Sequence, residues 1–204
     1  MWMAELAARA QTPVPTVKYY LREQLLPAGE RIGATRSSYS EEHVRRLRLI
    51  RALVDVAGMG LDAVRDVLAA VDAEAEHGNR VEALGTAHGA LSPRHPTTPS
   101  ATSRQRVADL VSERGWHVDP DGPHGRALSA ALDAMDAAEH PLEEAALAVY
   151  ADAMTEVAAA EVDATLQRAG ADAVTYAVTG TVLAEPVLLA LRRMAQQDEA
   201  LRRG

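Results

Sequence analysis

The chain has 204 residues, enough for one large domain or two small ones. It contains no cysteine, which excludes disulfides, thiolate metal sites, iron–sulfur clusters and a cysteine nucleophile. Its net charge of −8 argues, taken as a whole, against a nucleic-acid binder, because Lys and Arg make most phosphate contacts.

The charge is unevenly distributed along the chain. Residues 1–54 carry nine basic and five acidic side chains, a net of +4, whereas the remaining 150 residues carry a net of −12. A basic segment joined to an acidic body is typical of a protein in which one part meets a polyanion. A solvated helix face without a partner is the alternative interpretation.

Helical periodicity runs through the sequence, and strand signals are almost absent, so we expect an all-α fold. A short helix at 3–10 is broken by two prolines, a second helix follows to about Gln24, and residues 27–38 form a loop or small hairpin. Ser40 is the N-cap of a third helix that ends at Gly58. Further helices are expected near 61–71, 103–114, 124–138, 142–169, 171–184 and 186–203.

A helix, a tight turn, a second helix with polar side chains and a basic loop are typical of a helix-turn-helix with a wing. Such a helix fits the major groove of DNA, where its polar face contacts base edges. Hydroxyls and cations beside it bind phosphates and fix the register of the protein on the duplex.

The strings MAELA (3–7), TVKYYLRE (16–23), LLP (25–27) and YSEEHVRRL (39–47) make residues 1–72 resemble the MerR family of transcriptional regulators. The resemblance implies a winged helix-turn-helix head, with its second helix in the major groove. It also implies a homodimer on a pseudo-palindromic operator in double-stranded promoter DNA. RNA polymerase at that promoter is a further implied partner. The resemblance also implies that the protein activates transcription by twisting promoter DNA whose elements are badly spaced.

Three positions, Thr16, Lys18 and Tyr19, match the DNA-facing residues of the family's recognition helix. Gln24 stands where the family usually has Gly, so it must accept a left-handed conformation at a cost of about 1 kcal/mol, or the helix must end differently. Arg36 precedes Tyr39 by three residues instead of the family's usual two, and Tyr20 resembles a packing residue. The full set of expected DNA-contacting residues is Thr16, Lys18, Tyr19, Tyr20, Arg22, Arg36, Tyr39 and Arg45.

After the DNA-binding domain at 1–72 we expect a connecting and dimerising helix with a Pro/Ser/Thr linker at 73–102. A helical domain at 103–204 that senses an effector is expected to follow. Without cysteine, a small organic effector is expected in preference to a metal or a redox signal. The larger candidate ligand-binding residues are Trp116, Met135, His140, Tyr150, Met154 and Tyr176, and packing in a core is the alternative role of each.

Neither a cofactor nor a bound metal is expected. His117 and His124 flank two aspartates in a loop, but no His pair has the helical spacing of a zinc site. Phosphate-binding glycine loops and nucleophile elbows are missing from the sequence, so we do not expect an enzyme. No membrane span or signal peptide is recognised, so we expect a cytoplasmic protein. The alternative function is an effector-free regulator whose C-terminal domain only dimerises or binds a protein.

Overall fold

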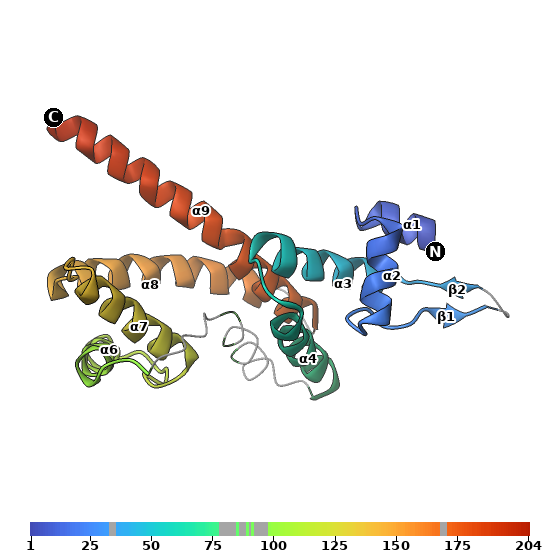
Figure 1. Cartoon of the computed structure of the whole chain (residues 1–204), viewed down its shortest axis with the longest axis horizontal. Helices are drawn as coiled ribbons and strands as arrows, with labels where there is room; N and C mark the ends of the chain where they lie inside the picture. The colour runs from blue at the N-terminus through green and yellow to red at the C-terminus, as the bar shows by residue number, and fades with distance from the viewer. Residues whose placement is uncertain (33–35, 78–84, 86–88, 90, 92–97, 168–170) are drawn as a thin grey trace. The chain divides into compact units, whose positions relative to one another are not determined.

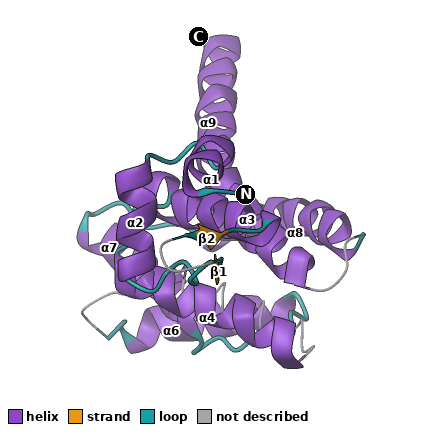
Figure 2. Cartoon of the chain, turned by 90° about the vertical axis from the view of Figure 1, so that its right-hand side faces the viewer, coloured by secondary structure: helices purple, strands orange, loops and turns teal. Residues whose placement is uncertain are grey.

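The computed structural model describes residues 1–32, 36–77, 85, 89, 91, 98–167 and 171–204. Most of these residues are helical, and the described strands form one short antiparallel hairpin (Figure 2). The predicted all-α fold with a small β wing is therefore confirmed. None of the described helices is both long enough and apolar enough to cross a membrane.

The chain divides into two compact units. The head unit contains Met1–Asp72 together with Thr175–Gly204, and the second unit contains Ala73–Val174. Figure 1 follows the elements along the chain. Those of the head unit are α1 (Met3–Arg9), α2 (Val14–Arg22), β1 (Glu30–Arg31), β2 (Ser37–Ser38), α3 (Glu41–Arg51), the π-helical turn η1 (Ala52–Val56), most of α4 (Leu61–His77) and most of α9 (Ala171–Arg203).

A tight turn joins α1 to α2. Gln11 adopts a left-handed conformation with φ 51°, which ends α1. The buried Thr12 follows, and its hydroxyl donates to the carbonyl of Ala10 at 3.0 Å. Pro15 lies in the first turn of α2, where its missing N–H removes no helical hydrogen bond. Both helices direct apolar side chains into the head core, among them Leu6, Val17 and Tyr20.

The wing is the hairpin β1–β2, in which Glu30 pairs with Ser38 and Arg31 with Ser37. Gly29 precedes β1 and lies close to the backbone of the opposite strand. A Cβ at this position would lie 2.5 Å from the carbonyl oxygen of Ser38. Only glycine fits there without displacing backbone.

A capping box starts α3, as the N-cap prediction for Ser40 requires. His43 Nδ1 accepts a hydrogen bond from the backbone N–H of Ser40 at 3.1 Å and lies 2.9 Å from its hydroxyl oxygen. After Arg51 the helix widens into η1, where the N–H of Ala57 donates to the carbonyl of Ala52 at 3.1 Å. Gly58, with φ 64°, then ends the predicted helix.

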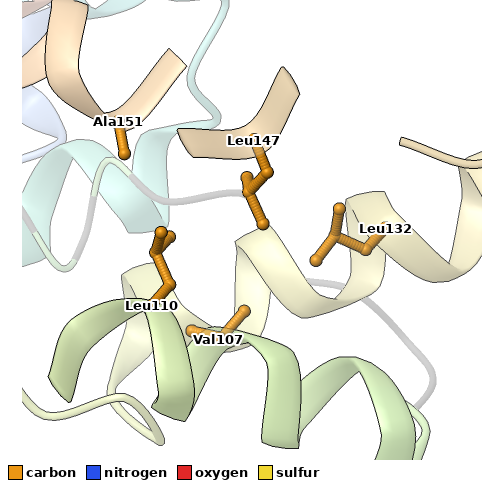
Figure 3. Close-up of a cluster of buried hydrophobic side chains, with 5 residues drawn as sticks. All are labelled: Val107, Leu110, Leu132, Leu147 and Ala151. Atoms are coloured by element: carbon orange, nitrogen blue, oxygen red, sulfur yellow. The ribbon is translucent and has the colours of Figure 1, made fainter. Parts of the chain in front are cut away.

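Three helices build the core of the second unit: α6 (Ala101–Glu113), α7 (Pro123–Ala137) and α8 (Glu144–Leu166). Their buried side chains meet in one cluster, to which Trp116, Leu128 and Leu142 add partly buried surface. Figure 3 shows the members of this cluster, which are Val107, Leu110, Leu132, Leu147 and Ala151.

Ion pairs and side-chain caps tie these three helices together. Ser100 caps α6 and also donates from its backbone N–H to Asp133 of α7 at 2.7 Å. The Ser100 hydroxyl also donates to Asp133 at 2.6 Å, and this hydrogen bond is the main reason why the pKa of the Asp133 carboxyl is lowered. Arg114 donates to the Ala148 carbonyl and to Asp152 on α8, both at 2.9 Å.

The C-terminal part of the sequence prediction needs one correction. Helix α9 runs unbroken through Pro186, where two helices were expected. The proline removes only one amide donor, and the Leu- and Ala-rich residues on both sides continue the helix. Within the structure, Thr175–Gly204 group with the head unit, and the effector domain expected at 103–204 stays a prediction. Periodicity reveals that a helix has an apolar face but not which element that face contacts.

The segment expected at 73–102 is only partly described. Helix α4 extends to His77, beyond the predicted end near residue 71. Most of the predicted Pro/Ser/Thr linker lies outside the described residues.

Candidate nucleic-acid interface

Helix α2 has a buried face and a polar outer face. Val17 and Tyr20 are buried, whereas Lys18 and Arg22 are exposed. Thr16 and Tyr19 are half-buried at the border between these faces. Lys18 forms no ion pair within the part of the chain that the structure describes. The outer face therefore presents a hydroxyl, an ammonium and a guanidinium, which are the kinds of donor that proteins use toward base edges and phosphates.

Tyr19 and Arg22 act as a pair on this face. The guanidinium carbon of Arg22 lies 5.3 Å from the centre of the Tyr19 ring, within cation–π range. The Tyr19 ring in turn lies 5.8 Å from that of Tyr20. The contact holds the Arg22 cation near the helix surface and restricts its side chain.

Two of the expected DNA-contacting tyrosines are core residues. Tyr20 is 5% exposed and Tyr39 is 8% exposed, and burial raises the pKa of both phenols. The Tyr39 ring packs edge-on against the His43 imidazole with 5.3 Å between ring centres. Tyr20 thus occupies the packing position that its sequence context favoured. Both rings position the recognition helix and the wing from within.

The wing carries its basic residues at the surface. Arg31 and Arg36 are exposed on the two sides of the hairpin, and the Arg36 guanidinium carbon lies 5.9 Å from the ring centre of Trp2. Trp2 itself is half-exposed. Sequence reasoning missed this partner, since nothing in the sequence links position 2 to the wing.

The arginines of α3 divide into two groups. Arg45 is exposed, as expected for a residue proposed to contact DNA. The others donate to carbonyl oxygens elsewhere in the head: Arg46 to Leu25 at 2.7 Å, Arg48 to Arg9 at 3.1 Å and Arg51 to Gln11 at 2.7 Å. Arg9 is the last residue of α1, Gln11 lies in the turn between α1 and α2, and Leu25 follows the end of α2. Much of the basic charge of residues 1–54 therefore stabilises the helix-turn-helix.

Gln24 ends the recognition helix in the left-handed conformation, with φ 59°. Of the two outcomes predicted for Gln24, a left-handed residue or a different helix end, the structure has the left-handed residue. After it, the N–H groups of Leu25 and Leu26 both donate to the Tyr20 carbonyl, at 3.0 and 3.2 Å. Both leucines are buried, so this turn returns the chain to the core directly behind α2.

The six candidate effector residues are distributed over both units. Trp116 packs on the core cluster of the second unit, and Met135 is half-buried on α7. His140 is exposed, while Tyr150 and Met154 are exposed one helical turn apart on α8. Tyr176 lies on α9 in the head unit. Five of them therefore belong to the second unit, and Tyr176 belongs to the head unit.

No group of three or more His, Asp or Glu side chains within the described residues is placed to hold a metal ion. In the loop that contains His117 and His124, Asp119 has a structural role. Its carboxylate accepts the backbone N–H of Asp121 at 2.9 Å and stabilises the turn before α7.

Comparisons with known proteins agree with this architecture. Residues 1–71 match the model of the MerR HTH family regulatory proteins. The crystal structure of SCO5550 from Streptomyces coelicolor A3(2), described as a candidate transcriptional regulator, is similar over the whole chain. The two share 35% sequence identity with a TM-score of 0.76, over 100% of this chain and 97% of that one. No curated protein matches the chain. The matched residues contain the helix-turn-helix and wing described above, and the chain belongs to the MerR family of DNA-binding transcriptional regulators.

Proposed function

We propose that α2 enters the major groove of promoter DNA, with Thr16, Lys18, Tyr19 and Arg22 facing the bases and phosphates. The observation that carries this proposal is the polar outer face of α2, which is held from its inner side by Tyr20 and by the bond from Arg46 to Leu25. The membership of the chain in a regulator family points to control of transcription and not to catalysis.

The wing supplies the second contact in this proposal. Arg31 and Arg36 on the hairpin bind phosphates beside the groove, and Arg45 on α3 extends this basic surface. Two heads in a homodimer then bind the half-sites of a pseudo-palindromic operator, because the two-fold symmetry of a dimer is mirrored in its site. RNA polymerase at the same promoter is the further partner that we propose.

A selection experiment identifies the DNA sequence that the protein binds. A randomised duplex library is enriched on the purified full chain, and the selected duplex is used in fluorescence anisotropy. We expect Lys18→Ala to weaken binding at least tenfold, in the range of one lost base or phosphate contact. Arg104→Ala is the matched control, since Arg104 is an exposed cation on α6 of the second unit. Equal affinities of the Lys18→Ala and wild-type chains would contradict the assignment of α2.

We further propose that the second unit binds a small organic effector. Its half-buried Trp116 and Met135, with Tyr150 and Met154 nearby in sequence on α8, supply aromatic and thioether surface suited to an apolar molecule. His140, in the segment between α7 and α8, adds an exposed imidazole to this candidate set.

Thermal unfolding in the presence of a metabolite and drug library tests the effector proposal. A compound that binds only the folded chain raises the melting temperature. We expect Tyr150→Ala to reduce that shift and Arg104→Ala to leave it unchanged. If no compound shifts the chain while it still binds DNA, the effector-free alternative is favoured.

A further inference from the structure

Trp2 and Arg36 meet where the segment before α1 lies beside the wing. The Arg36 guanidinium carbon is 5.9 Å from the centre of the indole ring, at the outer edge of the cation–π range. Trp2 is 49% exposed, and Arg36 is exposed as well, so the contact lies at the surface of the head. Leu6, four residues after Trp2, is fully buried. The large Trp2 ring therefore lies outside the core that its neighbour helps to build.

Backbone hydrogen bonds fix the position of both partners. Before Trp2, the Met1 nitrogen donates to the Tyr39 carbonyl at 2.8 Å, and the Met1 carbonyl accepts the Tyr39 N–H at 2.9 Å. After it, the Trp2 carbonyl accepts the first hydrogen bond of α1 at 2.9 Å. The Arg36 carbonyl accepts the N–H of Ile32 at 2.8 Å across the hairpin. The two side chains thus extend from backbone that is held in place on both sides of the contact.

We propose that Trp2 is a positioning residue of the DNA interface, whose indole face holds Arg36 of the wing in place for a DNA phosphate. This inference rests on the wing contact of the proposed function and adds to it a residue outside the recognition helix and the hairpin. Arg31, on the other strand, has no such ring contact within the described part of the chain.

The chemistry of arginine suits this arrangement. A guanidinium donates to phosphate oxygens from its N–H edge, while its flat face remains free to rest on an aromatic ring. Arginine is among the side chains that lose the most rotamer freedom when they become ordered. A ring that already restrains the Arg36 side chain reduces the freedom lost on binding, so phosphate is bound more tightly.

A double-mutant cycle tests whether Trp2 acts through Arg36. Affinity for the selected duplex is measured by fluorescence anisotropy for Trp2→Ala, Arg36→Ala and the double variant of the full chain. We expect Trp2→Ala to weaken binding about two- to fivefold, the scale of an exposed cation–π contact. Once Arg36 is alanine, Trp2→Ala should bring no further loss, whereas in the matched Arg31→Ala chain it should keep its full effect. The same loss with and without Arg36 would overturn the proposal, as would an unchanged affinity in Trp2→Ala.

Two further variants separate the ring face from its apolar bulk. Trp2→Phe keeps an aromatic face and should bind DNA more tightly than Trp2→Leu, which keeps apolar surface alone and should resemble Trp2→Ala. Circular dichroism and urea denaturation verify that each variant folds as the wild type does. If the leucine variant bound as tightly as the phenylalanine variant, packing and not the cation–π contact would be responsible, and the proposal would fail.

A duplex of scrambled sequence and equal length supplies an independent readout. Because a phosphate contact carries no sequence information, Trp2→Ala should weaken binding to the selected and the scrambled duplex by the same factor. A loss confined to the selected duplex would overturn the positioning role. Wild-type affinity in Arg36→Ala would remove the wing contact of the proposed function together with this inference. A loss in Arg36→Ala that is independent of Trp2 would overturn this inference alone.

Discussion

Arg51 donates from Nη1 to the carbonyl oxygen of Gln11 at 2.7 Å, across 40 residues of sequence. Gln11 is the left-handed residue of the turn between α1 and α2, so the contact fixes the angle at which the recognition helix leaves the turn. We expect Arg51→Ala to lower the free energy of unfolding by about 1 kcal/mol, measured by urea denaturation. Arg51 also pairs with Asp55 at 2.9 Å, so Asp55→Ala is the control. An equal loss in both variants would assign the effect to the ion pair and not to the turn.

Replacing Gln24 with glycine should stabilise the folded protein. Its φ of 59° is a conformation that costs a side chain about 1 kcal/mol and costs glycine almost nothing. Gln24→Gly is therefore expected to raise the free energy of unfolding by about 0.5–1 kcal/mol, whereas Gln24→Ala should bring no gain. Thermal unfolding of the two variants side by side checks this. If Gln24→Ala also raised the free energy of unfolding, the glutamine side chain, and not the left-handed backbone, would be destabilising the wild-type protein.

Gly29 should tolerate no side chain. The Cβ of Gly29→Ala would lie 2.5 Å from the Ser38 carbonyl and 2.8 Å from the Tyr39 ring. We expect the wing to shift and DNA affinity to fall at least tenfold, with the helical content retained. Gly60→Ala is the matched control, because a Cβ there meets nothing within 4 Å. Unchanged affinity in Gly29→Ala would mean that the wing adds little to binding.

His43 should make the head sensitive to mild acid. Desolvation lowers the pKa of its imidazole below the usual 6.5, ahead of the opposing influences of the Ala28 backbone and of Glu42, and Arg46 lowers it further. Protonation of Nδ1 also removes the acceptor for the Ser40 N–H. The unfolded chain therefore takes up the proton first, so stability is complete above about pH 6.5 and declines as the pH falls below it.

The variant His43→Gln isolates this effect. Glutamine preserves an acceptor at the third position of the helix, as a capping box requires, but does not titrate. The difference in melting temperature between wild type and variant should change as the pH falls from about 7 to 5. Parallel pH profiles for the two proteins would contradict the role of His43.

The sequence predicted the helices α6, α7 and α8 to within three residues, and it predicted turns and caps as well in the head, for a physical reason. The positions of Thr16, Lys18, Tyr20 and Gln24 depend on contacts between neighbouring elements, and the family pattern records these contacts. Residues 1–71, which match the family, are also the part where turns and caps were predicted correctly.

Two features depend on long-range contacts that no local pattern contains. The contacts of Arg46, Arg48 and Arg51 with distant carbonyls could not be read from a run of basic residues, which usually indicates a solvated face. Similarly, the grouping of Thr175–Gly204 with the head unit depends on tertiary contacts. Pro186 predicted a helix boundary, but α9 continues through it.

The internal use of arginines limits how many counterions the head displaces from DNA. Arg9 pairs with Glu41, and three arginines of α3 bind carbonyl oxygens. The exposed cations of the proposed DNA-facing surface, which are Lys18, Arg22, Arg31, Arg36 and Arg45, are then the main source of phosphate contacts. At about 0.9 ions per contact, each head should contribute a slope of about −4 to −5 to the logarithm of affinity against the logarithm of salt concentration. The nine basic residues of the segment, if all were engaged, would give about −8. Titrations between about 50 and 200 mM salt separate the two values, and the shallower slope means that this regulator keeps much of its affinity where a fully electrostatic binder would dissociate.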